Sequence, residues 1–178
     1  MEEKKGQTSI RSVRMPVGLI AELEKESESS HVSVNTIINT ILFRHLEWDR
    51  YAEKFGFMGL SRETFQAMAS HMEESDLSTL AKSVSSTVLK EFALFCWEIK
   101  GPNSFLEFIQ GFARYSRIGD WEVRNDGPFH RASLLHKMGP KVSFYLSELY
   151  SDLLESITGV KAEVDILENE FIMKFTIA

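Results

Sequence analysis

The side chains of this 178-residue chain that could carry out chemistry are few and widely spaced. The single cysteine, Cys96, lies on an apolar helical pattern, which favours a small buried hydrophobic residue over a nucleophile. His130 and His136 share one face of an expected strand, but six strand residues separate them by about 20 Å, too far for one metal ion. We therefore expect no catalytic constellation, no metal site and no cofactor, and we do not expect an enzyme.

Known short motifs do not change this expectation. The chain has no phosphate loop, Gly-x-Ser-x-Gly elbow, His-Glu-x-x-His run or Cys-x-x-Cys pair. Two groups of side chains, one basic and one aromatic, each allow two interpretations. A basic cluster could bind an anion or be solvated charge, and it comprises Arg131, His136, Lys137 and Lys141. An aromatic stripe could line a pocket for an apolar ligand or haem, or could be ordinary core, and it comprises Phe92, Phe95, Phe105, Phe108 and Phe112.

Charge is distributed unevenly along the chain. With Lys+Arg 20 and Asp+Glu 26 the net charge is −6, which argues against a protein that coats nucleic acid by bulk charge. Residues 1–16 nevertheless carry a net charge of +2, because Lys4, Lys5, Arg11 and Arg14 outnumber two glutamates. Residues 17–60 carry −3 and residues 61–178 carry −5. The N-terminal segment is therefore the candidate for contact with an anionic partner.

The composition is that of a globular protein without membrane segments. The hydrophobic fraction is 43%, and the longest apolar run, Phe92–Trp97, is far shorter than the roughly 20 residues of a membrane helix. No apolar stretch follows the first five residues, so we expect no secretory signal. One cysteine cannot close a disulfide within the chain. We expect a cytoplasmic protein that folds by its own core and has no membrane partner.

The elements that would position the N-terminal charges follow from periodicity. Ser9–Met15 alternates with period two, which predicts a strand, and Pro16 suits the first position of a helix. The apolar spacing after Pro16 predicts a helix of about three turns, ended by the serines of residues 27–30.

A second helix is expected after Ser33, which can cap it. Its predicted buried face follows the i, i+3, i+4, i+7, i+8 spacing and consists of Val34, Ile37, Ile38, Ile41 and Leu42. The polar continuation Glu47–Lys54 predicts that the helix runs on toward the second region.

A single strand and two helices make an incomplete fold. The strand over Ser9–Met15 has no expected neighbour in its own region to satisfy its backbone hydrogen bonds. A unit of about 55 residues with so little core usually needs oligomerisation or cross-links. Both deficits disappear if two copies pair their strands antiparallel and pack their helices together. We therefore predict an obligate homodimer, with assembly of tandem dimers left open.

These residues resemble a known family. Arg11-Ser12-Val13-Arg14-Met15-Pro16, a short helix, a polar turn, and then Ser33-Val34-Asn35 with an isoleucine-rich helix are similar to the ribbon-helix-helix DNA-binding family of Arc, MetJ and CopG type. The resemblance covers about residues 8–50. It implies a two-stranded ribbon in the major groove of double-stranded DNA, with Ile10, Ser12 and Arg14 facing the bases. It also implies a phosphate clamp at the start of the second helix, made by Ser33, Val34 and Asn35.

The residue types fit this implied role with two differences. Arg14 can form a bidentate contact with guanine, and Lys4 and Lys5 could add salt-dependent contacts with phosphates. Ile10 is apolar and could contact only a thymine methyl group. By the alternation of the strand, Arg11 should point toward the helices and away from the bases. Either Arg11 turns outward to a phosphate, or the register of the strand is shifted by one residue. The choice between Arg11 and Arg14 as the main base contact stays open.

The second region predicts a separate domain. Two glycines interrupt the helical pattern at Phe55–Leu60, and we place the boundary there, with one domain over residues 1–55 and another over 61–178. Residues 61–100 predict two helices, and a third begins near Asn103 or Ser104. Strands at Trp121–Arg124 and Phe129–His136 follow, then a helix from Gly139-Pro140 to Gly159 and a C-terminal hairpin.

The predicted order of this region is ααα-ββ-α-ββ, so the whole chain is expected to be an α+β protein with an N-terminal ribbon-helix-helix. The expected function is a dimeric, sequence-specific transcriptional regulator whose second domain senses a small-molecule effector or oligomerises. Two alternatives remain. One is a protein-interaction module of antitoxin type in which the ribbon-helix-helix mainly dimerises, and the other is a haem or small-molecule sensor fused to it.

Overall fold

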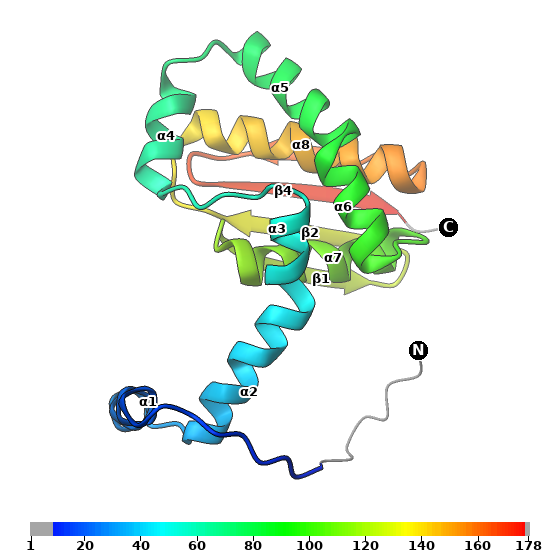
Figure 1. Cartoon of the computed structure of the whole chain (residues 1–178). Helices are drawn as coiled ribbons and strands as arrows, with labels where there is room; N and C mark the ends of the chain where they lie inside the picture. The colour runs from blue at the N-terminus through cyan, green and yellow to red at the C-terminus, as the bar shows by residue number, and fades with distance from the viewer. Residues whose placement is uncertain (1–8, 177–178) are drawn as a thin grey trace. The chain divides into compact units, whose positions relative to one another are not determined.

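The computed structural model describes residues 9–176 and divides the chain into two compact units (Figure 1). Unit 1 ends at Leu46 and unit 2 begins at Glu47. The glycine-containing tract Phe55–Leu60, where composition suggested a boundary, lies inside unit 2. The reason is that Trp48 and Ala52, which precede the tract, are buried in the core of unit 2.

Unit 1 contains two helices that pack against each other, α1 (Val17–Ser30) and α2 (Val34–Arg44). Ser33 caps α2 as expected, because its side chain accepts a hydrogen bond from the backbone N–H of Thr36 at 3.1 Å. The serine tract ends α1 as expected, but only at its last residue, Ser30, so the helix of 14 residues is about one turn longer than the three turns predicted. The hydroxyls of Ser29 and Ser30 bond to the backbone carbonyl of Glu26, and the helix continues to its left-handed terminus at His31.

The strand expected over Ser9–Met15 is not present in this single chain. Residues 9–15 precede α1 without helical or strand hydrogen bonds, so no ribbon is shown at the N-terminus. A strand is defined by hydrogen bonds to a neighbouring strand, and the sheet of this structure is built only from residues 120–176. The α+β class is confirmed by the chain as a whole, whereas the ribbon-helix-helix remains a prediction.

The helical backbone continues beyond α2, as the polar pattern of Glu47–Lys54 predicted. A five-residue π-helix, η1 (His45–Asp49), is followed by α3 (Arg50–Lys54), which ends at Phe55. Within unit 2, the buried Trp48 ring lies edge-on to Phe92 and to Phe112. This segment is therefore part of the aromatic core of unit 2.

Unit 2 has five further helices. They are α4 (Arg62–Ser70), α5 (Glu74–Ser86), α6 (Val88–Trp97), α7 (Pro102–Ser116) and α8 (Pro140–Thr158). The second of the two helices predicted over residues 61–100 is broken in two at Thr87, so the prediction of two helices there is wrong. Hydroxyls at the end of α5 bond back to carbonyls three and four residues earlier, from Ser85 and Ser86 to Lys82 and from Thr87 to Ser83, and such bonds bend helices.

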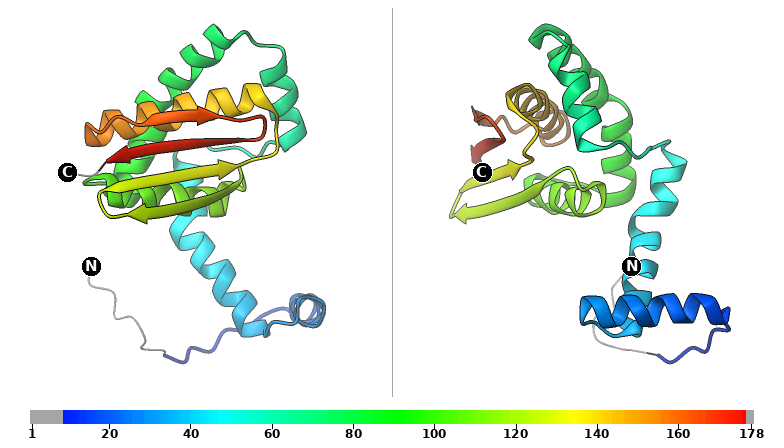
Figure 2. Two further views of the ribbon diagram at one scale, coloured as in Figure 1. Left: turned by 180° about the vertical axis from the view of Figure 1, so that it is seen from behind. Right: turned by 90° about the vertical axis from the view of Figure 1, so that its left-hand side faces the viewer.

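Four antiparallel strands form one sheet. They are β1 (Asp120–Asp126), β2 (Phe129–Leu135), β3 (Glu163–Ile166) and β4 (Glu170–Thr176), in the order β1-β2-β4-β3. The helices of unit 2 lie on one side of the sheet, and the other face is left bare (Figure 2). The predicted pairs of strands on either side of α8 are confirmed.

The core of unit 2 lies between the sheet and these helices. α7 and α8 pack on the strands, and α5 packs on α8. On α7 the residues expected to face inward are buried, namely Phe105, Phe108, Ile109 and Phe112. Two polar contacts join α5 to α8, from Ser78 to Glu148 at 2.9 Å and from Ser85 to Asp152. Unit 2 is thus a complete α+β core of its own.

Candidate functional sites

The four predicted DNA-contacting residues before α1 are all exposed. Ile10, Arg11, Ser12 and Arg14 lie in the segment that has neither helix nor strand hydrogen bonds. Ile10 is 97% exposed, so nothing in the described chain covers it. Lys4 and Lys5 lie outside the described residues. These four side chains are therefore close along the chain and accessible. Because their segment is neither helix nor strand, they do not share a face of a regular element.

The start of α2 has the local geometry of an anion-binding helix terminus. The Ser33 hydroxyl accepts the N–H of Thr36 and also lies 2.8 Å from the Thr36 hydroxyl. The N–H groups of Val34 and Asn35, in the first turn, have no intrahelical acceptor. Two backbone donors and the positive end of the helix dipole are thus available there, as the resemblance implies.

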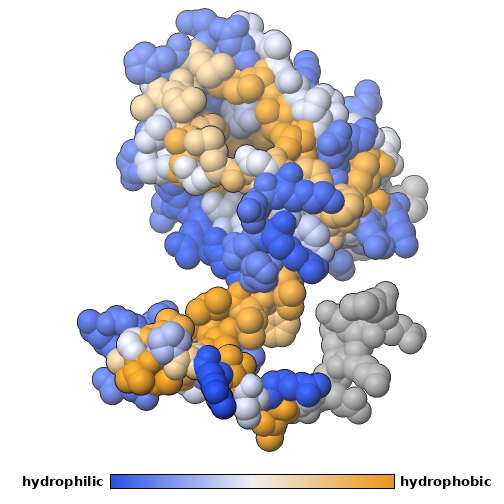
Figure 3. All heavy atoms as spheres, in the orientation of Figure 1, coloured by the Kyte–Doolittle hydropathy of each residue, from blue (hydrophilic) through white to orange (hydrophobic). Residues whose placement is uncertain are grey.

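Unit 1 exposes most of its large apolar side chains. Among its described residues, Leu23 and Ile37 are the only apolar side chains that are buried. Of the face predicted to be buried on α2, Ile41 and Leu42 are 54% and 53% exposed. Hydrophobic residues cover much of α2 in the space-filling view (Figure 3). The exposed large apolar residues of unit 1 are Ile10, Val13, Val17, Leu19, Ile20, Val32, Ile41, Leu42, Phe43 and Leu46.

A buried histidine and serine lie side by side in unit 2, where β2 leads into α8. The Nε2 atom of His136 lies 2.8 Å from the Ser143 hydroxyl, and both residues are 0% exposed. The His136 Nδ1 atom accepts the backbone N–H of Met138 at 3.0 Å. Because Nδ1 is the acceptor, Nε2 must carry the proton and donate it to Ser143, whose hydroxyl donates to the carbonyl of Glu168 at 3.2 Å.

This tautomer decides what the pair can do. A histidine that activates a serine must accept the hydroxyl proton, whereas His136 donates toward Ser143. Burial, and secondly the positive charge of Arg62, lower the pKa of His136 to about 4. The pair therefore links the end of β2 to α8 and to the turn before β4. In this tautomer His136 does not act as a base that activates the Ser143 hydroxyl. Spacing along the chain does not predict this pair, because the turn at Gly139 is what brings Ser143 of α8 next to His136.

The other isolated candidates have structural roles. The His130 ring stacks on Phe175, with 5.8 Å between ring centroids, and its Nδ1 lies 2.7 Å from the Asn125 side-chain oxygen. Burial raises the pKa of the Cys96 thiol to about 11, against the lowering effect of Lys54 and Arg50, so the reactive thiolate is disfavoured. Among the described residues, no three His, Cys, Asp or Glu side chains are placed to hold a metal ion.

The aromatic stripe is mostly core and lines no described cleft. Phe92, Phe105 and Phe108 are fully buried, and Phe112 is nearly so, while Phe95 is 55% exposed and lies under the ammonium group of Lys54. The rings pack on one another, as Phe108 does on Phe112 with 5.6 Å between centroids. These contacts favour the interpretation as core over a pocket for haem.

The basic cluster of the sequence is not one site in the structure. Arg131 is exposed on the bare face of the sheet, His136 is buried, and the Lys141 ammonium donates to the carbonyl of Ser70 at 3.2 Å and to that of Met72. Arg131 instead lies directly between Arg124 of β1 and Lys174 of β4. Those two neighbours are each paired with a carboxylate, of Glu122 and of Asp165.

Two open clefts lie on unit 2. The first, of about 630 Å³, is at the end of the sheet and contains the Arg124, Arg131 and Lys174 row beside Glu163. The second, of about 600 Å³, is lined by three arginines that the sequence does not bring together, Arg62, Arg114 and Arg117. Sequence reasoning missed this second cleft because Arg62 and Arg117 are 55 residues apart in the chain.

No protein-family model matches the chain, and a search of curated proteins finds no significant match. Within residues 9–176, no helix combines the length and the apolar composition needed to cross a membrane.

Proposed function

We propose that the protein is a dimeric, sequence-specific DNA-binding transcriptional regulator of ribbon-helix-helix type that acts in the cytoplasm. The observation that carries the proposal is the exposure of the apolar face of unit 1. In this proposal two copies pair residues 9–15 as an antiparallel ribbon that enters the major groove of DNA. Unit 2 serves as an effector-sensing or oligomerising module.

The apolar exposure supports a second copy of the same chain as the partner of unit 1. Fully burying one large apolar side chain stabilises a protein by about 1.5–3 kcal/mol. Unit 1 leaves Ile41, Leu42 and Phe43 more than half exposed, although Ile41 and Leu42 belong to the face that the helical spacing predicts to be buried. A dimer would cover this face, as a single small unit cannot.

The unpaired N-terminal segment supports the ribbon. Residues 9–15 have the alternation of a strand but no strand neighbour among residues 9–176 of their own chain. Antiparallel pairing with the same segment of a second copy would satisfy their backbone groups, because a two-fold axis places identical strands side by side. The outward side chains of that ribbon would be those of Ile10, Ser12 and Arg14 on both copies.

The proposed DNA contacts are of two kinds. Arg14 and Ser12 would contact base edges and supply sequence preference, with Arg11 as the alternative arginine. The free N–H groups of Val34 and Asn35 would hold a phosphate and fix the register of the ribbon on the duplex. Lys4 and Lys5 would add salt-dependent contacts with the backbone.

The dimer is tested by sedimentation of the full-length protein and of an Ile41→Asp/Leu42→Asp variant. Both side chains are already half exposed in the single chain, so the change costs a monomer little but places two charges inside a dimer interface. We expect the wild type to be a dimer and the variant a folded monomer. The matched control is Leu94→Asp, at a 42% exposed position of α6, which should leave the dimer intact. A monomeric wild type would refute the proposal.

DNA binding is tested by selecting bound genomic fragments at two salt concentrations, with wild type, Arg14→Ala and Arg11→Ala. We expect Arg14→Ala to remove the sequence preference and leave the dimer unchanged, and total affinity to fall with salt. Arg124→Ala, on unit 2, is the control and should bind like wild type. A dimer that selects no fragment would instead indicate a pure dimerisation or antitoxin-type module.

A further inference from the structure

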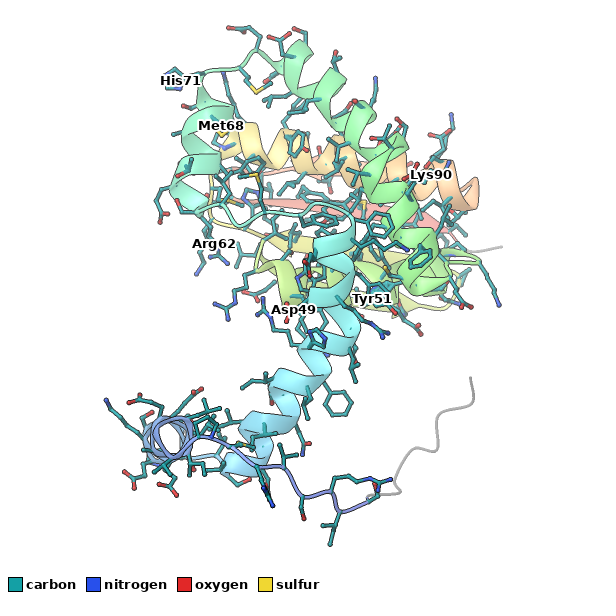
Figure 4. All side chains as sticks on the ribbon, viewed as in Figure 1. Asp49, Tyr51, Arg62, Met68, His71 and Lys90 are labelled. Atoms are coloured by element: carbon teal, nitrogen blue, oxygen red, sulfur yellow. The ribbon has the colours of Figure 1, made fainter. Side chains whose placement is uncertain are left out.

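The arginine cleft of unit 2 has the features of a ligand site. Its volume of about 600 Å³ lies within the range of small-molecule sites. Three of its lining residues are the arginines Arg62, Arg114 and Arg117, and the only carboxylate among them is that of Asp120. Figure 4 shows Arg62 at the surface of unit 2 near the beginning of α4.

The backbone that shapes the cleft is held in place. α7 ends at Ser116, and the capping residue Arg117 adopts the left-handed conformation with φ 56°. Two residues later the chain passes so close to β2 that a side chain on Gly119 would place its Cβ 2.5 Å from the carbonyl oxygen of Leu135. The connection from α7 to β1 therefore lies against the end of β2 and has little room to move.

Arg62 is anchored to this connection. Its Nε and Nη2 atoms both donate to the carbonyl oxygen of Arg117, at 3.2 and 2.8 Å. This contact joins α4 to the end of α7 and fixes the plane of the guanidinium group. Arg62 also lines the cleft, so its positive charge is held there before any ligand binds.

The cleft carries an excess of positive charge. Among the described residues, none of the three arginines has a carboxylate within ion-pair distance, whereas Arg124 on the sheet is paired with Glu122 at 2.7 Å. The negative end of the α7 dipole offsets only about half of one charge. Capping of the end of α7 explains the position of Arg62 only, because Arg62 is the arginine that donates to the Arg117 carbonyl. Arg114 also interacts with the Tyr115 hydroxyl, which is hydrogen-bonded to the carboxylate of Glu47. No such polar partner is found for the Arg117 guanidinium among the described residues.

The cleft offers one further kind of donor. Gln110 brings a side-chain amide to its lining. Trp121 also lines the cleft, but its ring packs edge-on against the buried rings of Tyr150 and Phe171. An anion in this cleft would find N–H donors from arginine and glutamine side chains.

We propose that this cleft binds a small molecule through a phosphate group. Three guanidinium groups match the three terminal oxygens of a phosphate, whereas a carboxylate has only two. The ligand chemistry is that of free phosphate, pyrophosphate or a phosphorylated metabolite. The inference concerns unit 2 alone and does not require that unit 1 binds DNA.

Calorimetric titration of the full-length protein with inorganic phosphate and with pyrophosphate tests the site. We expect saturable binding of pyrophosphate at one site per chain, weakened by salt. Arg117→Gln and Arg114→Gln should each weaken binding about tenfold or more, since a hydrogen bond to a charged group is lost. Both side chains are exposed, so these variants should fold, and tryptophan fluorescence during unfolding checks that they do. The matched control, Arg124→Gln, should bind like wild type.

Each other outcome overturns the proposal in a different way. An absence of saturable binding of either anion shows that the arginines are solvated charge. Equal binding of citrate shows that the cleft does not select phosphate. Equal weakening by Arg124→Gln places the binding elsewhere on unit 2. If Arg114→Gln and Arg117→Gln weaken DNA binding while pyrophosphate does not bind, the cleft contacts the nucleic acid backbone instead.

Discussion

Removal of the buried imidazole of His136 should change how the stability of unit 2 depends on pH. The ring is enclosed, its Nδ1 already accepts the N–H of Met138, and its Nε2 donates to Ser143. A proton added to Nδ1 would meet the N–H of Met138 and would place a charge in a site without a carboxylate partner. Burial and the nearby charge of Arg62 accordingly lower the pKa of His136 from 6.5 to about 4.

The sign and size of the effect follow from linkage. The folded protein binds fewer protons than the unfolded chain between pH 6.5 and 4, so the contribution of His136 is fully present above pH 6.5 and is lost as pH falls toward 4. A shift of one pKa unit corresponds to about 1.4 kcal/mol. The free energy of unfolding should therefore decrease by about 2 kcal/mol on going from pH 7.5 to 5 through this residue alone, and by about 3 kcal/mol at pH 4.

Denaturant unfolding of wild type and His136→Gln at pH 7.5, 6 and 5 measures the contribution of His136 to the free energy of unfolding. All three tryptophans, Trp48, Trp97 and Trp121, belong to unit 2, so their fluorescence reports its unfolding. At pH 7.5 the variant should be the less stable protein, because it loses the imidazole contacts. The gap should narrow by about 2 kcal/mol at pH 5, since only the wild type loses the histidine contribution.

The control variant removes an exposed histidine, His71→Gln, and shows how far the loss of any histidine changes the pH dependence. A gap between wild type and His136→Gln that is constant from pH 7.5 to 5 would refute the assignment of a buried neutral imidazole. A His136 resonance that titrates above pH 6 in nuclear magnetic resonance spectra would refute it independently.

Two further predictions concern backbone geometry. Gly119→Ala should destabilise unit 2 by about 1–3 kcal/mol in the same fluorescence assay, because its Cβ would overlap the carbonyl of Leu135, whereas Gly101→Ala, which meets open space, should change stability much less. Ser33→Ala should remove the cap of α2 at a cost of about 1 kcal/mol, measured as roughly fivefold faster hydrogen exchange at the Thr36 amide; unchanged exchange there would contradict the capping role.

Most elements of unit 2 could be predicted because their ends carry strong local signals. Gly101-Pro102 begins α7, Gly139-Pro140 begins α8, and Gly159, with φ 75°, ends α8. Between these signals the apolar spacing is long enough to determine the type of each element. The break at Thr87 was missed because the apolar stripe continues across it. The run Ser85-Ser86-Thr87 was the available signal, since such hydroxyls compete with the helix for backbone carbonyls.

The candidate sites of unit 2 were harder to predict because they depend on tertiary contacts. The sequence grouped Arg131 with Lys141, yet the alternation of β2 turns Arg131 toward the bare face, while Lys141 on α8 reaches the end of α4. Conversely, Arg62 and Arg117 share a cleft only because α4 lies next to the end of α7. Spacing along the chain carries information about one helix or strand, and these sites combine several elements.

Unit 1 differs for another physical reason. Hydrogen bonds to a second strand are what make an extended segment a strand, so a segment whose partner belongs to another molecule cannot be one in a single chain. The proposed second copy would also cover Ile41 and Leu42, which are exposed although their spacing predicts burial. Both of these departures from the sequence prediction occur in the same 46 residues, while in unit 2 the strand pairs before and after α8 agree with it. A missing second copy explains both with one assumption, and for that reason the oligomeric state is the first property to measure.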